Sequence, residues 1–332
     1  MIWGHFLNSQ WALVLCFTAS VVVLHTRIRP LIVPISAIYF IVLSVLSSFW
    51  FTWHEGNHPA IQERLHAASA QATIALMVLI GFFSVITEAQ AKAICLALGA
   101  FGQLVGLSVL CAALVYSSVQ YKTPVFMNPS MTASFVAVTM PYALGLTRNH
   151  KWLRLAVLIN TVVTVLVCKA LAPVAVLGVV CAVIFWQRLW FWACAGACGL
   201  YAITQLNLGS SGRVEKWALA LSGFLKFDVT DLLFGLGAGS TKVYLPLWDK
   251  TPDGSWTYLH NDWLQIGIEF GAIGLVLAVL CYAALIKTTI QKPFDLASTL
   301  GFGVLMALNP PLHWGLYAFC GAAIFRCGMT RG

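Results

Sequence analysis

The stretch Tyr258-Leu-His-Asn-Asp-Trp-Leu-Gln-Ile-Gly-Ile-Glu-Phe-Gly-Ala-Ile-Gly274 joins a polar loop to an apolar run, and the rest of the chain is organised around it. His260 and Asn261 end the loop, and the apolar run begins at once. Asn261 is expected to cap a helix, because its side-chain oxygen can accept a free backbone N–H of the first turn. His260 then lies at the positive end of the helix dipole, which favours a neutral imidazole that can accept a proton.

The helix that begins here carries polar residues inside an apolar segment. Asn261, Gln265 and Glu269 are spaced i, i+4 and i+8, so they share one face. Acids within membrane spans are costly, which makes Glu269 a functional candidate. It is expected about two and a half turns below His260, so we assign it to orienting or packing together with Gln265. A second stripe consists of small residues that would let a neighbouring helix approach closely: Gly267, Gly271 and Gly274.

The composition indicates a membrane protein. The 332 residues are 60% hydrophobic and 9% charged, whereas a soluble domain carries about 25% charged residues. The formal net charge of +8 comes from basic residues scattered between apolar runs, a pattern typical of topology signals rather than nucleic-acid binding. The ten cysteines lie in or beside apolar runs without zinc-ligand spacing, so we interpret them as small buried apolar residues. We expect no metal site and no cofactor.

Hydropathy predicts an all-α, polytopic transmembrane helical bundle of about eleven spans. We expect 1–332 to form a single membrane domain. The spans are predicted near 8–26, 31–51, 69–87, 93–117, 129–146, 154–169, 171–187, 189–206, 263–286, 296–309 and 311–326. The alternation of Lys and Arg between the loops puts the N-terminus, the long loop 207–262 and His260 outside the cytoplasm.

The long loop 207–262 is the second informative region. Apolar residues recur in it at helical spacing and predict an amphipathic helix in the outer membrane interface: Val214, Trp217, Ala218, Leu221, Phe224 and Leu225. The following Asp231–Ser240 contains Gly-x-Gly-x-Gly. It lacks the preceding strand of a dinucleotide site, so that interpretation is set aside.

His260-Asn261, then nine residues, then Gly271-x-x-Gly274 resembles the signature of the O-antigen ligase and polymerase superfamily. Members are polytopic bacterial membrane glycosyltransferases that use undecaprenyl-diphosphate-linked glycans. The resemblance implies a metal-independent, inverting transferase. It runs from about Asn128 to Gly274.

The resemblance also implies roles for four further residues. Arg213 resembles a functional Arg that stands shortly before a Trp, and Lys169 stands where the family often has an Arg thought to bind diphosphate. Asn128 lies in a Phe-x-Asn-Pro segment, where it could cap a helix or hydrogen-bond in the site, and Gly237 belongs to a turn near the diphosphate or sugar. The alternatives are a basic residue touching lipid headgroups for Arg213, a snorkelling lysine for Lys169, and plain turns for Asn128 and Gly237.

The leading hypothesis is transfer of a glycan from an undecaprenyl-diphosphate-linked donor to a growing O-antigen chain, lipid A-core or pilin. The reaction is expected at the periplasmic face of a bacterial inner membrane. Arg213, with Lys169 in second place, would neutralise the diphosphate, and His260 would take the proton of the acceptor hydroxyl. Asn261, beside His260, is also expected to bind substrate, as are Asn128 and Gly237. Two alternatives stay open: a transporter of a small anion such as bicarbonate, and a purely structural membrane partner.

Overall fold

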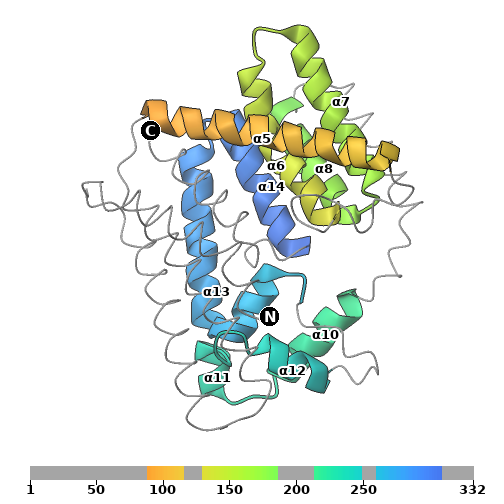
Figure 1. The fold of residues 1–332 in the computed structure, drawn as a ribbon. Coiled ribbons are helices and arrows are strands. Elements are labelled where there is room, and N and C mark those ends of the chain that lie inside the picture. Colours follow the sequence, from red (N-terminus) through yellow and green to blue (C-terminus); the bar gives the residue numbers. More distant parts are fainter. Residues whose placement is uncertain (1–87, 116–128, 186–212, 249–258, 309–332) are drawn as a thin grey trace, which may run out of the picture. The chain divides into compact units, whose positions relative to one another are not determined.

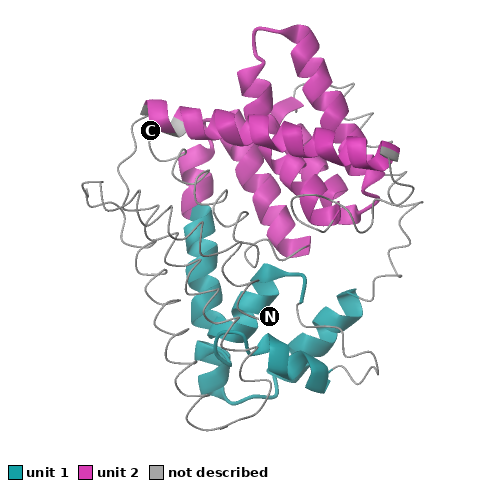
Figure 2. Cartoon of the chain, viewed as in Figure 1, with its two compact units in different colours: residues 1–85, 212–283, 310–322 teal, residues 86–211, 284–309, 323–332 magenta. Residues whose placement is uncertain are grey.

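The computed structural model describes residues 88–115, 129–185, 213–248 and 259–308, and every regular element in these ranges is an α-helix (Figure 1). The chain divides into two compact units (Figure 2). The described part of the first unit comprises 213–248 and 259–283, and that of the second comprises 88–115, 129–185 and 284–308. The single membrane domain stays a prediction.

The second unit is built around α6 (Pro129–Leu146), which is buried from Met131 to Leu144. Its neighbours in the unit are α5 (Glu88–Val115), α7 (Lys151–Val167), α8 (Leu171–Phe185) and α14 (Pro293–Leu308). These helices lie close to the predicted spans, and α6 has the predicted bounds. The predicted spans 8–26, 31–51, 69–87, 189–206 and 311–326 lie outside the described residues.

Small residues bring α5 close to α6 and α7. A Cβ at Gly102 would overlap the Thr139 side chain, and a Cβ at Gly106 would lie 2.8 Å from Asn160 Nδ2. At this approach Asn160 Nδ2 donates to the carbonyl (3.0 Å) and to Oε1 (2.8 Å) of Gln103. Hydrogen bonds between closely packed helices are the usual way in which polar side chains are satisfied inside a membrane bundle.

Helix α7 buries three polar side chains and exposes most of its large apolar ones. The buried side chains include Asn160, Thr161 and Thr164. The exposed apolar side chains are Trp152, Leu153, Leu155, Ile159, Val162, Val163 and Leu166. In water this arrangement would leave apolar surface hydrated. It is typical of a helix that faces lipid on its outside and a polar contact on its inside.

The described part of the first unit contains α10 (Arg213–Phe224), α11 (Val229–Phe234), α12 (Thr241–Trp248) and α13 (Asp262–Thr289) up to Ala283. Helix α11 is defined by local signals, because the Asp228 side chain accepts from the Asp231 N–H at its start and Gly235 ends it at φ 85°. By length and hydropathy, two described segments could cross a membrane, namely Lys92–Leu114 and Asp262–Thr289.

Candidate functional site

Helix α13 is broken into two arms at Gly271, whose φ of 68° and ψ of −172° are not helical. Trp263 and Tyr282 lie on different arms, and their ring centroids are 5.4 Å apart. A straight helix would hold them about 28 Å apart, so the second arm turns back along the first. A Cβ at Gly267 would be 3.6 Å from Leu275 Cδ2, which agrees with this reversal. Figure 1 shows the two arms meeting at an elbow.

The elbow corrects the prediction of one straight span over 263–286 with a stripe of glycines on one face. Gly271 interrupts the helix instead of lining it, because glycine adopts φ of 68° without a steric penalty. The backbone of Leu233 occupies the place where a Cβ of residue 271 would point. The close approach that Gly271 permits is therefore to the end of α11, at the elbow.

The glycine-rich turn 235–239 docks onto the end of the first arm. The N–H of Leu236 donates to the carbonyl of Ile268 (2.9 Å), and the N–H of Gly237 donates to the carbonyl of Glu269 (3.0 Å). The last carbonyls of a helix have no N–H partner within the helix. The break at Gly271 therefore leaves the carbonyls of Ile268 and Glu269 in need of donors from elsewhere, and the glycine-rich turn supplies them. Gly237, predicted to bind substrate, thus has a backbone contact that accounts for its place in the turn, and its role toward substrate stays a prediction.

Glu269 lies in a buried polar contact between α12 and α13. Its Oε1 accepts a hydrogen bond from the Thr241 hydroxyl and another from Gln265 Nε2 (2.9 Å). All three side chains are buried. A buried carboxylate needs such donors to offset the loss of water. The predicted pairing of Gln265 with Glu269 is confirmed as a contact, and Thr241 is an additional partner.

Asn261 caps the first arm as predicted: its Oδ1 accepts from the N–H of Leu264 (3.0 Å), and its carbonyl accepts from the N–H of Gln265 (3.0 Å). His260 immediately precedes the cap and is half-buried. Its φ of 52° is in the left-handed region, which non-glycine residues adopt rarely. The geometry at the start of the arm thus includes a backbone conformation that the motif alone did not predict.

Arg213 is the first residue of α10 and is half-buried. Burial lowers the pKa of its guanidinium below the ordinary value, but an arginine remains charged at neutral pH. Trp217 lies one turn later on the same face, and its Nε1–H donates to the carbonyl of Leu259 (2.6 Å). The helix that carries Arg213 is therefore hydrogen-bonded to the residue that precedes His260.

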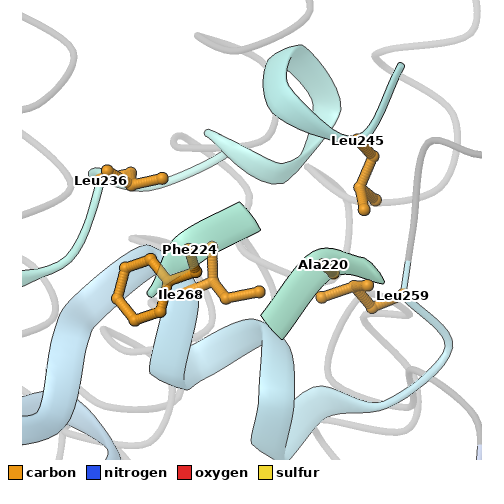
Figure 3. Close-up of a cluster of buried hydrophobic side chains, with 6 residues drawn as sticks. All are labelled: Ala220, Phe224, Leu236, Leu245, Leu259 and Ile268. Carbon is orange, nitrogen blue, oxygen red and sulfur yellow. The ribbon is translucent and has the colours of Figure 1, made fainter. Parts of the chain in front are cut away.

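A buried apolar cluster holds these segments together (Figure 3). It combines side chains from α10, the glycine-rich turn, α12, the residue before the His-Asn pair, and the first arm of α13: Ala220, Phe224, Leu236, Leu245, Leu259 and Ile268. Burying one large apolar side chain contributes about 1.5–3 kcal/mol. The cluster thus fixes α10 against the turn that contains His260.

The predicted amphipathic helix exists as α10, which ends at Phe224, one residue before Leu225. The apolar residues of the predicted stripe divide into two groups. Trp217 and Phe224 pack inward with the cluster. Val214, Leu221 and Leu225 are 70%, 44% and 60% exposed. The prediction that all these residues form one stripe facing lipid is therefore wrong, because Trp217 and Phe224 pack against the apolar cluster. Placement of the exposed group in the membrane interface stays a prediction.

Lys169 belongs to the second unit, in the turn between α7 and α8, and its side chain is exposed. Its φ is 47°, and its N–H donates to the carbonyl of Leu166 (3.2 Å), so it ends α7 in a left-handed conformation. Asn128 lies outside the described residues. Their roles in a site shared with Arg213 and His260 stay predictions.

The structure therefore brings Arg213, Gly237, His260, Asn261, Gln265 and Glu269 into one compact unit. Sequence reasoning missed the contacts of Thr241 and Trp217. Thr241 lies two residues after the glycine-rich turn, which was a usable signal for a polar contact near that turn. The partner of Trp217 lies far along the chain, and no local pattern indicates it.

No protein-family model matches this chain, and no curated protein matches it either.

Proposed function

We propose that this protein is a membrane glycosyltransferase of the O-antigen ligase and polymerase type. It transfers a glycan from an undecaprenyl-diphosphate-linked donor to a growing O-antigen chain, a lipid A-core or a pilin. The proposed site faces the periplasm of a bacterial inner membrane. The His-Asn and glycine motifs of Tyr258–Gly274 support the class through their resemblance to that family.

The hydrogen bond from Trp217 to the Leu259 carbonyl is the observation that carries the proposal. Arg213 precedes Trp217 by one turn, which corresponds to about 6 Å along the helix. His260 follows Leu259 directly. The hydrogen bond from Trp217 to Leu259 therefore connects the helix that carries Arg213 with the residue next to His260. The proposed reaction needs a cation, which Arg213 would supply, and a proton acceptor, which His260 would supply.

In the proposed reaction the acceptor oxygen attacks the anomeric carbon of the donor sugar, and the bond from that carbon to the diphosphate oxygen breaks with inversion. The imidazole of His260 takes the proton of the attacking hydroxyl. The electron pair of the broken bond stays on the lipid diphosphate, whose growing charge Arg213 neutralises. Gln265 and Glu269 hold the arm that begins at the His-Asn pair.

Gene deletion followed by complementation tests the proposal. Deletion is expected to cause accumulation of lipid-linked glycan, the unaltered gene to reverse it, and Arg213→Ala to fail to reverse it. Arg148→Ala is the matched control, because Arg148 is exposed in the second unit. Loss of long chains with single repeats retained would identify a polymerase, loss of all capping a ligase, and an unglycosylated pilin the protein-acceptor branch. Unchanged lipid-linked glycan after deletion would contradict the proposal.

One observation favours the transporter alternative. Small-anion transporters commonly bind substrate at discontinuous helices, and α13 is interrupted at Gly271 beside the buried Glu269. Uptake of labelled bicarbonate into vesicles that contain the purified protein would separate the two functions. Uptake that is lost in Glu269→Gln, together with no glycan transfer, would establish the transporter.

A further inference from the structure

The backbone of His260 has a conformation that its neighbours must maintain. Its φ of 52° lies in the left-handed region, where the Cβ of an L-residue crowds the following carbonyl oxygen. Such residues persist when the surrounding structure fixes them on both sides. His260 is followed by Asn261, whose side chain is bound to the first turn of α13 through the N–H of Leu264.

Trp217 fixes the other side of His260. The Leu259 carbonyl belongs to the same planar peptide group as the N–H of His260. The hydrogen bond from Trp217 Nε1 to this carbonyl, at 2.6 Å, therefore fixes the orientation of the peptide group that precedes the N–Cα bond of His260. The angle φ of His260 is the rotation about that bond. The Leu259 side chain is fully buried in the apolar cluster, so packing of this side chain also holds Leu259 in place.

The same indole belongs to the helix that begins at Arg213. Trp217 lies one turn after Arg213 on α10, and the next turns of this helix are anchored through Ala220 and Phe224 in the apolar cluster. A change in the bond from Trp217 to Leu259 would shift the imidazole of His260 relative to the guanidinium of Arg213. The bond therefore ties the backbone before His260 to the helix that begins at Arg213.

We infer that Trp217 is a positioning residue, whose indole N–H holds the Leu259 carbonyl and thereby keeps His260 in its left-handed conformation, oriented relative to Arg213. The effect of Trp217 on turnover rests on the proposed function, whereas its effect on the His260 backbone does not. Trp217 itself takes no part in proton transfer or in charge neutralisation.

The variant Trp217→Phe tests the inference, because it keeps an aromatic ring in the cluster and removes the N–H. Trp248→Phe is the matched control: Trp248 packs against the same cluster, while the Leu259 carbonyl takes its hydrogen bond from Trp217. Replacing Trp217 by benzothienylalanine, which keeps the bicyclic shape without the N–H, should reproduce Trp217→Phe. Replacing it by 5-fluorotryptophan, which keeps the N–H, should reproduce the unaltered protein.

The first measurement needs no substrate. Diethylpyrocarbonate modifies histidine, and mass spectrometry of the His260 peptide gives the modification rate in the purified full-length protein. One net hydrogen bond corresponds to roughly a 2- to 13-fold change in an equilibrium. We expect the modification rate of His260 to change within that range in Trp217→Phe, and to stay unchanged in Trp248→Phe.

The second measurement is turnover with a lipid-linked donor. Misplacement of a catalytic group by about 1 Å can cost roughly 100-fold in rate, so kcat should fall by about 10- to 100-fold while KM for the donor changes little. An unchanged His260 modification rate in Trp217→Phe would overturn the inference, and so would an equal change in Trp248→Phe. If the unaltered protein transfers no glycan, the proposed function fails, and the modification rates alone decide the role of Trp217.

Discussion

The backbones of Gly235 and Gly271 lie against each other. A Cβ on either glycine would come within 2.5 Å of the backbone nitrogen of the other. A Cβ at Gly235 would overlap the carbonyl group of Glu269, and a Cβ at Gly271 would overlap the carbonyl group of Leu233. Both glycines also have positive φ, 85° and 68°. The elbow of α13 and the end of α11 therefore depend on one shared backbone contact.

Gly271→Ala is expected to destabilise the protein by more than about 2 kcal/mol. A φ of 68° with ψ of −172° is a conformation adopted almost only by glycine and costs another residue roughly 1–3 kcal/mol, and the overlap involves backbone atoms that cannot move aside. Thermal unfolding in detergent, followed by tryptophan fluorescence, measures the change. Gly178→Ala is the control, since Gly178 is helical with no atom within 4 Å of an added Cβ. There the substitution should be neutral or stabilise by up to about 1 kcal/mol.

Thr241→Val should destabilise the first unit by about 1–3 kcal/mol, because the buried Oε1 of Glu269 loses the Thr241 hydroxyl and keeps the hydrogen bond from Gln265 Nε2. Thr241→Ser keeps the hydroxyl and should restore most of the loss. The same unfolding measurement applies. Thr288→Val provides a comparison at an exposed position and should change stability by less than about 0.5 kcal/mol. Equal effects at 241 and 288 would mean that the contact with Glu269 contributes no stability.

Arg213→Lys should lower turnover by roughly 10- to 100-fold with the protein still folded, because ammonium is a point charge and cannot donate two parallel hydrogen bonds to a diphosphate. Burial lowers the pKa of Arg213, but the group stays charged through neutral pH. The pH profile of the unaltered protein should therefore show no loss of activity from this residue near neutrality. Full activity in Arg213→Ala, at normal protein level, would remove Arg213 from the site.

Lys169 offers a way to separate charge from backbone conformation. Lys169→Asn removes the charge, while asparagine accepts the left-handed conformation seen at φ 47°. Its stability should stay within about 0.5 kcal/mol, as for an ordinary surface substitution. If the charge serves the diphosphate, turnover should fall in Lys169→Asn and be kept or raised in Lys169→Arg. Unchanged turnover in both variants would indicate a snorkelling lysine.

His260→Ala should abolish transfer with donor binding retained, because a lost general base typically costs about 10²–10⁴-fold in rate. His260→Asn is the sharper variant, since asparagine fits φ of 52° and still forms hydrogen bonds but takes no proton at neutral pH. Turnover of each purified variant with lipid-linked donor is the measurement. Near-normal turnover in His260→Asn would end the general-base assignment and leave the proposed class intact.

Where a signal is local, the sequence predicted the structure. Helix α6 was predicted at its observed bounds, because hydropathy is continuous across it and no left-handed residue interrupts it. The cap at Asn261 was predicted because a capping residue acts on the N–H groups that follow it directly. The start of α10 near Val214 followed from spacing alone.

Where a structure depends on contacts between distant segments, the sequence did not determine it. From the sequence alone, Gly271 is compatible with a helix interior and with a helix break. In the structure the helix breaks there, where the backbone of Leu233 and Gly235 packs against Gly271. Trp217 was placed on a lipid-facing stripe, although its indole is used by the Leu259 carbonyl. Periodicity records that a residue is apolar. It does not say which of two apolar surroundings, lipid or a neighbouring segment, the residue meets.

The contact between Trp263 and Tyr282 also bears on depth in a bilayer. The second arm, 272–289, is about 27 Å long, close to the hydrocarbon thickness of about 30 Å. If this arm crosses the bilayer, the elbow marks one membrane surface, and Trp263, eight residues before Gly271, lies alongside the arm at about 12 Å from that surface. His260 then stands below the level of the headgroups. On the proposed function, the diphosphate of a lipid-linked donor would have to move inward to reach His260, and an acceptor sugar would have to enter through a polar opening in the protein.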